Sequence, residues 1–374
     1  MSYDVIIVGA GSMGMAAGYY LTKENKIVLL LDSYDPPHSN GSHHGETRII
    51  RHAYGEGAKY VPLVLRAQEL WEELEKEAGM ELFIKTGVLN IGEESSPFIQ
   101  EVQNSAKEYG LSVETLSAQE INNKWEGLNL PSNLIGCYET NSGVLFSEKS
   151  ILAFRQLAEA NGATIKVNSR VVDMERRPKK VIVKTEDESY EAASLIIATG
   201  AQTGHFLKKL NKNVPLQRLR KTFSWFQAPE AHYDSTKFPA FTMNIGDEMY
   251  YGFPSIHKAG LKIGRHDGGQ PLQPDEAMKP FGAYVEDEED VTKVVRQFFP
   301  KVGELKEGKT CMYTNTPDED FIIDYLPKLP NVVLACGFSG HGFKFSSVVG
   351  EIVSKLVTNN NVSFDLSPFQ INRF

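Results

Sequence analysis

Cysteine, net positive charge and long apolar runs are all scarce in this sequence of 374 residues. Its three cysteines, Cys137, Cys311 and Cys336, are too few for a disulfide framework and show no CxxC spacing. This favours a reducing compartment and argues against structural zinc. The chain has 39 Lys and Arg against 48 Asp and Glu, a net charge of -9. Nucleic acid is therefore an unsuitable partner, because phosphate contacts need a cationic face.

No stretch approaches the ~18 apolar residues of a membrane-spanning helix. The first apolar run starts at Tyr3, with no basic leader ahead of it, so we expect a cytoplasmic protein without a membrane segment. Apolar residues make up 41% and charged residues 23% of the chain, which is typical of a globular protein. At roughly 150 residues per domain, the length predicts two or three domains.

The first 32 residues predict a dinucleotide-binding unit. A β-branched run from Tyr3 to Val8 leads into a glycine-rich turn, a helix to about Lys23 and a second apolar run that stops at Asp32. Glycines in this pattern allow a tight turn and close approach to a pyrophosphate, and the helix N-terminus offers N–H groups to phosphates. Asp32 is placed to accept hydrogen bonds from ribose hydroxyls. Because its carboxylate would repel a 2′-phosphate, NADP is disfavoured. The candidate residues of the turn are Gly9, Gly11, Ser12, Met13 and Gly14.

The unit alone does not distinguish NAD from FAD, but distant segments favour FAD. Strand patterns return at Ser194–Ala198 and Asn331–Ala335, and the latter runs into a glycine-rich loop and a helix from about Lys344. Such a loop and helix could direct a dipole at a flavin. Alternating, strand-like runs in residues 81–144 and 216–316 predict an antiparallel insertion.

We therefore expect an α/β fold with a Rossmann-like FAD-binding domain and an inserted, mainly antiparallel substrate domain. The first would comprise residues 1–80, 145–215 and 317–374. The second would comprise residues 81–144 and 216–316.

Four cations are candidates for chemistry, and each has a structural alternative. Arg48 and Arg51 are three apart, so a helical turn would set both on one face toward an anion, but a solvated basic edge has the same spacing. Lys344, between two phenylalanines, would bind a carboxylate or extend past the rings to water. Lys262 lies in an alternating run and would be a desolvated cation if it faced a cavity. Periodicity does not decide between these alternatives.

Other side chains leave similar choices open. Cys311 stands in a polar stretch and is a candidate reactive thiol, although an inert thiol is more common. Tyr251 could line a pocket or pack across strands. The adjacent His43 and His44 point in different directions and have no nearby acid in sequence, so we expect no metal site.

Six strings spread over the chain carry a family resemblance. They are DVIIVGAGS (4–12), GSHHG (41–45), RIIRHAYGEG (48–57), NSGVL (141–145), CMYT (311–314) and GFSGHGFKF (337–345). With them the sequence resembles the monomeric sarcosine oxidase and N-methyltryptophan oxidase family of FAD-dependent amine oxidases. The resemblance implies FAD bonded covalently through Cys311, a substrate-carboxylate clamp of Arg51 and Lys344, and Lys262 as the residue that activates dioxygen.

The resemblance also implies the remaining site residues and the reaction. Arg48 would lie by the flavin, and Tyr251, His266 and Tyr313 would surround the substrate amine. Further candidate flavin contacts are His44, Val172, Gly200, Gly340, Gly342 and Lys344. The implied reaction uses dioxygen and water to convert an N-methyl amino acid into the primary amino acid, formaldehyde and hydrogen peroxide. The family name implies a monomer.

Two departures leave the substrate side chain open. Many relatives have Gly-x-Trp where this chain has Gly200-Ala201-Gln202. Met312 and residues 141–145 resemble sarcosine oxidases, whereas residues 220–227 and 317–321 resemble N-methyltryptophan oxidases. Three alternatives also stand: an FAD-dependent D-amino acid or glycine oxidase that attacks the α-carbon, an NAD-dependent dehydrogenase, and a non-catalytic flavin-binding or tRNA-modification partner.

Overall fold

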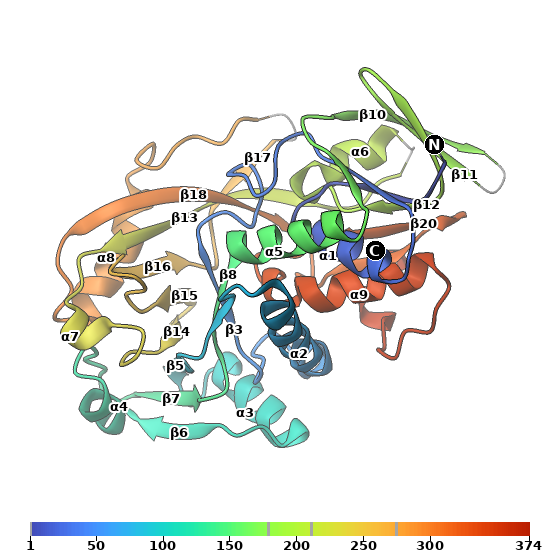
Figure 1. The fold of residues 1–374 in the computed structure, drawn as a ribbon. Helices are drawn as coiled ribbons and strands as arrows, with labels where there is room; N and C mark the ends of the chain where they lie inside the picture. Colours follow the sequence, from blue (N-terminus) through green and yellow to red (C-terminus); the bar gives the residue numbers. More distant parts are fainter. Residues whose placement is uncertain (1, 178–179, 210–211, 274–275) are drawn as a thin grey trace.

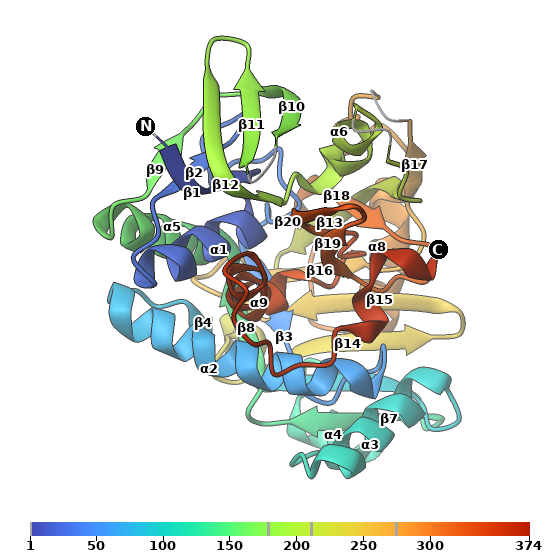
Figure 2. The ribbon, with the colours of Figure 1, turned by 90° about the vertical axis from the view of Figure 1, so that its right-hand side faces the viewer.

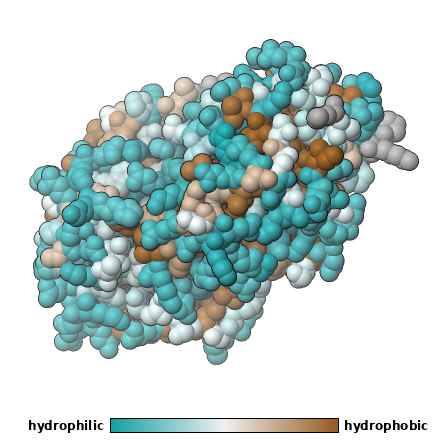
Figure 3. All heavy atoms as spheres, in the orientation of Figure 1, coloured by the Kyte–Doolittle hydropathy of each residue, from teal (hydrophilic) through white to brown (hydrophobic). Residues whose placement is uncertain are grey.

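Two large sheets dominate the computed structural model, which describes residues 2–177, 180–209, 212–273 and 276–374 (Figure 1, Figure 2). In the described residues the first sheet has eight strands and the second has nine, and a small sheet has three. On the face seen in Figure 1, hydrophilic residues dominate and apolar residues gather mainly at the upper right (Figure 3). Every helix in the described part of the chain is too short or too polar to cross a bilayer.

The first sheet is built around a parallel core. Its strands are β1 (Ser2–Val8), β2 (Val28–Leu31), β9 (Thr164–Lys166), β10 (Val171–Arg177), β11 (Lys180–Thr185), β12 (Ser189–Ile197), β19 (Ile322–Leu326) and β20 (Leu329–Cys336). Strand β1 pairs in parallel with β2 and β12, and β12 pairs in parallel with β20. Strands β10, β11 and β19 join in antiparallel fashion. The sheet is therefore mixed at its margins.

Both faces of this sheet are buried. Because successive strand residues point in opposite directions, each strand contributes side chains to two different cores. Val5 and Ile7 of β1 join a core formed with the helices α1 (Ser12–Lys23), α2 (Val61–Ala78), α5 (Ser147–Ala160) and α9 (Ser346–Val357). Ile6 and Val8 join the opposite core, formed with β10, β11 and α6 (Thr203–Lys209). Full burial of each such side chain contributes about 1.5–3 kcal/mol.

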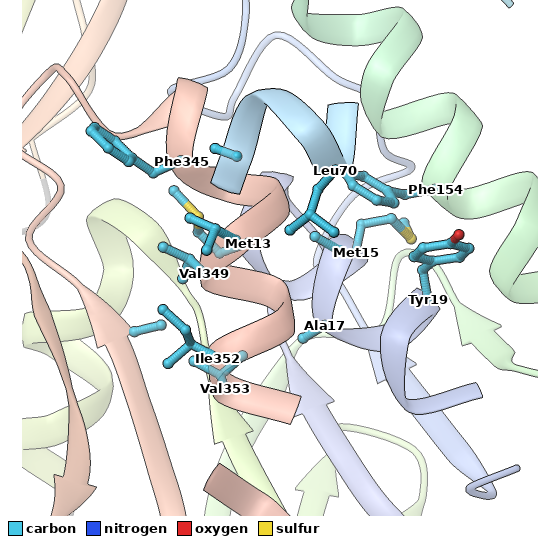
Figure 4. Packing of buried hydrophobic residues seen from close by; sticks show 14 of the residues in the cluster. Met13, Met15, Ala17, Tyr19, Leu70, Phe154, Phe345, Val349, Ile352 and Val353 are labelled. Atoms are coloured by element: carbon cyan, nitrogen blue, oxygen red, sulfur yellow. The ribbon is translucent and has the colours of Figure 1, made fainter. Parts of the chain in front are cut away.

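Helix α1 lies between α9 and α5 (Figure 4). Met13 and Met15 of α1 lie near Val349 of α9 and Leu70 of α2 in this core (Figure 4). A Cβ atom at Gly350 would lie 2.5 Å from the Cβ of Ala16. The glycine therefore permits the close crossing of α9 and α1, which fixes the helix that begins at the glycine-rich turn.

The second sheet is mainly antiparallel and follows the order β17-β13-β16-β15-β14-β5-β7-β6, with β18 also paired to β13. Its strands are β5 (Val88–Glu93), β6 (Glu114–Ser117), β7 (Leu134–Glu139), β13 (Gln217–Phe226), β14 (Ala240–Ile245), β15 (Glu248–Phe253), β16 (Leu261–Arg265), β17 (Gln270–Leu272) and β18 (Leu305–Asn315). The small sheet consists of β3 (Thr47–Ile50), β4 (Phe83–Ile84) and β8 (Gly143–Phe146). The other helices are α3 (Pro97–Tyr109), α4 (Ala118–Lys124), α7 (Glu230–Tyr233) and α8 (Glu286–Phe298), with short η1 (Ala58–Tyr60), η2 (Gly200–Gln202), η3 (Phe343–Phe345), η4 (Ser367–Phe369) and η5 (Ile371–Arg373).

The predicted fold class is confirmed: an α/β unit of the Rossmann type stands beside a mainly antiparallel sheet. The strands of the second sheet come from residues 88–139 and 217–315, but the proposed domain boundaries themselves stay a prediction. The sequence did not predict the small sheet or the long helix α2. The small sheet pairs β3 with β8, and this pairing positions the segment that carries Arg48 and Arg51.

Candidate functional site

The glycine-rich turn between β1 and α1 is held tightly by its neighbours. Gly9 has φ +94°, and a Cβ there would lie 2.3 Å from the carbonyl oxygen of Ala198. A Cβ at Gly14 would lie 1.8 Å from the carbonyl oxygen of Gly9. Both glycines are required by the packing of the turn itself.

Gly11 differs from the other two glycines of the turn. A Cβ there would meet only Nδ1 of His43, at 3.8 Å, within the described chain. Gly11 is also the N-cap of α1, and no described side chain caps that helix. The structure therefore leaves space and a helix N-terminus at the position where a pyrophosphate would approach the backbone.

Asp32 ties the end of β2 to this turn. Its Oδ2 accepts a hydrogen bond from the backbone N–H of Ala10 at 2.8 Å, and its Oδ1 accepts one from the N–H of Tyr34 at 2.9 Å. A carboxylate has about four acceptor positions, so ribose hydroxyls could still be accepted. The nearby His43 is buried, and burial lowers its pKa to about 4.

One face of the second sheet carries many of the predicted site residues. Directly opposite residues of antiparallel strands share a face, as do residues two apart on one strand. Lys262 stands opposite both Trp225 and Phe253, and Lys221 stands opposite Cys311. The same register places Tyr251, Phe223 and Tyr313 on this face. We call it the site face.

Lys262 lies at one end of the site face, and only 2% of its surface is exposed. Its Nζ donates to the carbonyl of Gly45 and to Oγ1 of Thr47, the latter at 3.0 Å. The rings of Phe223, Trp225 and Phe253 surround it at 4.7, 5.2 and 4.7 Å from Nζ. Burial lowers its pKa well below the usual value. Lys262 is therefore a desolvated amine and does not face solvent.

Arg48 lies near Lys262 but is held by backbone oxygens. Its Nη1 donates to the carbonyl of Thr47 at 2.7 Å, and its Nη2 donates to those of Ser42 and His44 at 2.9 and 2.6 Å. Glu148 holds the same loop, because its carboxylate accepts from the N–H groups of Gly45 and Glu46 at 2.8–3.1 Å. Nδ1 of His44 lies 3.7 Å from the Glu148 carboxylate.

The thiol of Cys311 is buried, with 4% of the residue exposed, and forms no disulfide. Burial raises its pKa, while the positive charges of Arg48, Lys221 and Lys262 act in the opposite direction. Lys221 is 3% exposed, and its Nζ donates to the carbonyls of Asp267 and Gly268. Burial lowers the pKa of Lys221 to about 8. The sequence offered no local signal for Lys221.

Arg51 belongs to a second cluster of charges. The guanidinium Nη2 lies 2.6 Å from both carboxylate oxygens of Glu56. Burial would raise the pKa of Glu56, but the charges of Arg51, His341, Lys344 and His266 together outweigh this effect, and the pKa falls to about 2. Glu56 was not among the site residues predicted from the sequence. The sequence did contain a signal for it, because Glu56 is an acid five residues after Arg51 within one of the family strings.

Lys344 reaches the same cluster and forms a short hydrogen-bond chain. Its Nζ donates to the hydroxyl of Tyr54 at 3.0 Å and to the carbonyl of His341 at 2.8 Å. Nε2 of His341 donates to the carbonyl of Glu319 at 3.0 Å, which leaves Nδ1 to accept from Tyr54 at 2.8 Å. Burial, followed by the charge of Arg51, lowers the pKa of Lys344 to about 7.

Uncharged polar groups lie beside this cluster. The hydroxyl of Tyr313 is 3.4 Å from Nδ1 of His266, and burial lowers the pKa of His266 to about 4. Burial raises the pKa of Tyr251 and of Tyr313. A Cβ at Gly340 (φ +78°) would lie 2.1 Å from the Tyr313 ring, so the glycine-rich loop after β20 packs directly against the site face.

The prediction that a helical turn places Arg48 and Arg51 on one face is wrong. Arg48 lies in strand β3, which is paired with β8, and Arg51 directly follows that strand. The β-branched residues Ile49 and Ile50 and the pairing with β8 favour a strand. The two guanidinium groups consequently have different partners, and they do not form one anion site.

Three other predicted contacts lie in less distinctive surroundings. Val172 lies where the pairing of β10 with β11 is irregular, between Val171 and Asp173. Gly200 begins η2 with φ +53°, and Gln202, where relatives have Trp, is exposed. Gly342 precedes η3. Their contacts with a flavin stay predictions.

Three comparisons with known proteins agree with this geometry. A family model described as FAD dependent oxidoreductase matches residues 4–356. The chain is 52% identical over 374 residues to a monomeric sarcosine oxidase of Arthrobacter sp., covering 99% of this chain and 96% of that protein. It is 45% identical over 375 residues to an N-methyl-L-tryptophan oxidase of Citrobacter koseri, covering 100% of both.

Solved structures show the same fold at lower identity. NikD, an unusual amino acid oxidase essential for nikkomycin biosynthesis, superposes in its open form with a TM-score of 0.87 at 22% identity, covering 99% of this chain and 97% of that one. Glycine oxidase from Geobacillus kaustophilus gives 0.81 at 19% identity, covering 100% and 98%. These two likenesses concern the fold alone.

The fold and the site define an oxidoreductase that uses a dinucleotide cofactor, and the cofactor of this class is FAD. A glycine turn with space at Gly11, an uncapped α1 and the acid at the end of β2 fit such a group. The chain belongs to the family of monomeric sarcosine oxidases and N-methyl-L-tryptophan oxidases.

Proposed function

We propose that the protein is an FAD-dependent oxidase that demethylates N-methyl amino acids. In the balanced reaction, R–NH–CH3, dioxygen and water give R–NH2, formaldehyde and hydrogen peroxide. Identities of 45–52% to sarcosine and N-methyl-L-tryptophan oxidases support this activity. The observation that carries the proposal is that the buried cations Arg51 and Lys344 lie in one cluster beside the site face of Cys311 and Lys262.

In this proposal the glycine turn and Asp32 would hold the dinucleotide part of FAD, and Cys311 would hold the flavin covalently. When bound, FAD supplies a two-electron acceptor that can be reoxidised by dioxygen. Arg48, His44, Val172, Gly200, Gly340 and Gly342 would contribute further contacts. Cys311 suits the covalent role because it lies on the site face, whereas Cys137 and Cys336 lie in separate apolar clusters.

Arg51 and Lys344 would bind the carboxylate of the substrate. A carboxylate between two cations in a buried site makes strong, charge-assisted hydrogen bonds. For this to occur, Glu56 must yield its position on Arg51, and the incoming carboxylate would raise the pKa of Lys344 again. Fixing the carboxylate also orients the N-methyl group, so that positioning replaces a bimolecular encounter.

His266, Tyr313 and Tyr251 would surround the amine. The amine must lose its proton before the N–CH3 bond can be oxidised, and the nearby cations disfavour the ammonium form. Because the pKa of His266 is about 4, its imidazole is neutral near pH 7 and adds no positive charge. It can accept a hydrogen bond from the amine N–H.

Lys262 would act on dioxygen. Electron transfer to dioxygen creates negative charge, and an ammonium group in a site of low dielectric stabilises that charge strongly. Burial lowers the pKa of Lys262, and an anion that forms beside it would raise this pKa again and favour the ammonium form. Lys262→Met should therefore slow the reaction with dioxygen more than the reaction with substrate.

A substrate panel tests the proposed function. The purified protein is incubated in air with sarcosine, N-methyl-L-tryptophan, glycine and D-alanine, and peroxide, formaldehyde and ammonia are measured. Formaldehyde equal to peroxide from an N-methyl substrate supports the proposal and ranks the acceptable side chains. Ammonia and a 2-oxo acid would instead support attack at the α-carbon.

We also propose that the protein is a cytoplasmic monomer with the two domains expected from the sequence. The separation of its strands into two large sheets supports the domain division. Light scattering after gel filtration tests the monomer, with a mass of 41.7 kDa expected. Limited proteolysis that yields fragments ending near residues 80, 144, 215 or 316 would support the boundaries.

A further inference from the structure

A cavity of about 480 Å³ lies next to Lys262 and has no part in the substrate binding proposed above. Its exposed outer residues are Glu46, Lys149 and His257. Its inner residues are buried and include Trp225, Phe253, Ile256 and Lys262. The cavity therefore leads from the surface to Lys262, whose described hydrogen-bond partners are neutral oxygens.

The walls of this cavity, which we call the Lys262 cavity, are mostly apolar. Phe146, Pro254 and Ala259 complete the apolar wall with the inner residues named above. Apolar walls hold water weakly and can take up small apolar molecules. A diatomic gas suits such walls better than a zwitterionic amino acid does.

The charges at the mouth of the cavity also disfavour entry of an amino acid. Glu46 and Glu148 both line the cavity, and hydrogen bonds from backbone N–H groups and His44 lower the pKa of Glu148 against the effect of burial, so it is anionic at neutral pH. Lys149 also lies at the mouth and cancels part of this charge, but the two carboxylates outweigh one lysine, and the remaining negative charge disfavours entry of a carboxylate. An uncharged molecule is not affected.

The Lys262 cavity is also separate from the carboxylate cluster along the sheet. Trp225 and Phe253 stand opposite Lys262, whereas Tyr251 and Phe223 stand one pair further along, opposite Gly264. His266, which lies beside the cluster of Arg51 and Lys344, follows beyond Gly264. The cavity and the cluster thus approach the site face from different ends of β16.

We propose that the Lys262 cavity is the entrance through which dioxygen reaches Lys262, and that the amino acid reaches the site by a different route. The inference rests on the proposed function, because a dioxygen entrance is useful only to an oxidase. It goes further by assigning walls and a mouth to the route of the second substrate. It predicts that filling the cavity slows the reaction with dioxygen and leaves amino acid binding unchanged.

Ala259→Phe is the test variant, because Ala259 lies in the wall and a phenyl ring there would fill part of the cavity. Ile256→Phe fills it from a neighbouring wall position, in case the first variant does not fold. Ala160→Phe is the matched control, since Ala160 is exposed at the end of α5. None of the three positions belongs to the proposed catalytic residues.

The first measurement uses xenon, which needs no turnover. Crystals of the holoenzyme pressurised with xenon should show it among Trp225, Phe253 and Ile256, and the Ala259→Phe protein should lack it. In the second measurement, the flavin is reduced with dithionite and mixed with buffers of known dioxygen concentration. The second-order rate constant of reoxidation should fall about tenfold in Ala259→Phe, equivalent to ~1.4 kcal/mol in the barrier, and stay unchanged in Ala160→Phe.

Several outcomes would overturn the inference. Absence of xenon from the wild-type cavity would do so, as would an unchanged reoxidation rate in a variant that has lost xenon. Weaker amino acid binding with unchanged reoxidation would assign the cavity to the substrate side chain. If no amino acid reduces the flavin anaerobically, the proposed function fails, but dithionite reduction and xenon still test the cavity.

Discussion

Nη2 of Arg51 lies 2.6 Å from both carboxylate oxygens of Glu56, so the arginine proposed to bind the substrate is already paired with an acid of its own chain. Arg51 has 5% of its side chain exposed and Glu56 has 31%. Glu56 is thus the partner with more access to water, and its carboxylate can leave Arg51 at a lower free-energy cost than a fully buried one could. We infer that Glu56 competes with the substrate carboxylate for Arg51.

The variant Glu56→Gln should therefore bind carboxylates more tightly. An uncharged amide is a weaker competitor for a guanidinium than a carboxylate is, and we expect Kd for acetate to fall about tenfold, or ~1.4 kcal/mol. Titration calorimetry measures Kd directly. Glu126→Gln, which removes an acid from an exposed pair with Lys301, is the control and should change nothing. Weaker acetate binding in Glu56→Gln would mean that Glu56 holds Arg51 in its binding position.

Replacing Cys311 by Ser should release the flavin from the chain. Cys137→Ser and Cys336→Ser are matched controls, because both thiols are buried in apolar clusters and burial raises their pKa, that of Cys137 to about 11. Acid-precipitated protein should stay yellow in the wild type and in both controls, and it should be colourless in Cys311→Ser. Yellow precipitate from Cys311→Ser would place the covalent bond elsewhere.

Lys221 should influence how fast that bond forms. The thiolate is the nucleophilic form of cysteine, and the charge of Lys221, directly across the strand pair, favours it. We expect Lys221→Met to slow covalent attachment about tenfold, as measured by the mass increase of flavin-free protein after addition of FAD. Lys309→Met is the control, since Lys309 lies two residues before Cys311 on β18 but pairs with Glu307. Equal rates in all three proteins would leave Lys221 with a packing role only.

The sequence predicted the parts of the site that depend on local patterns. The turn of Gly9, Gly11 and Gly14 follows from a strand, a glycine spacing and a helix that are contiguous in the chain, and Asp32 closes the same unit. The resemblance added the roles of Cys311 and Lys262. Their side chains lie on one face of the second sheet.

The rest depends on pairings between distant segments. Lys221 meets Cys311 only because β13 and β18 pair in one particular register. Periodicity could not orient Lys262, because both faces of β16 are buried and four of its five residues are inaccessible. The helical turn proposed for Arg48 and Arg51 failed because pairing with β8 outweighed the i, i+3 spacing.

Stability should depend strongly on one ion pair outside the site. Arg220 and Asp287 have 0% and 1% of their side chains exposed and form two hydrogen bonds of 2.7 Å. Asp287→Ala would leave the guanidinium buried without its counter-ion, and the free energy of unfolding should fall by about 3–5 kcal/mol. Guanidinium chloride titration measures this loss. Glu126→Gln, in an exposed pair, should cost little, and equal losses would contradict the argument.

The affinity for carboxylates should depend on pH through Lys344. Burial and the neighbouring Arg51 lower the pKa of Lys344 to about 7, so in the free protein it is charged below this pH and neutral above it. A carboxylate binds the charged form. Kd for acetate should therefore be constant below pH 7 and rise above it toward tenfold per pH unit.

Other groups of the cluster should not produce this profile. The pKa values of His266 and His341 are lowered to about 4 and about 3, so both imidazoles are neutral from about pH 6 to 9, where acetate stays ionised. Lys344→Met should bind acetate weakly with the same Kd across this range. If the wild-type Kd were also independent of pH, Lys344 would keep its charge in the free protein, and the clamp would not be tuned by desolvation.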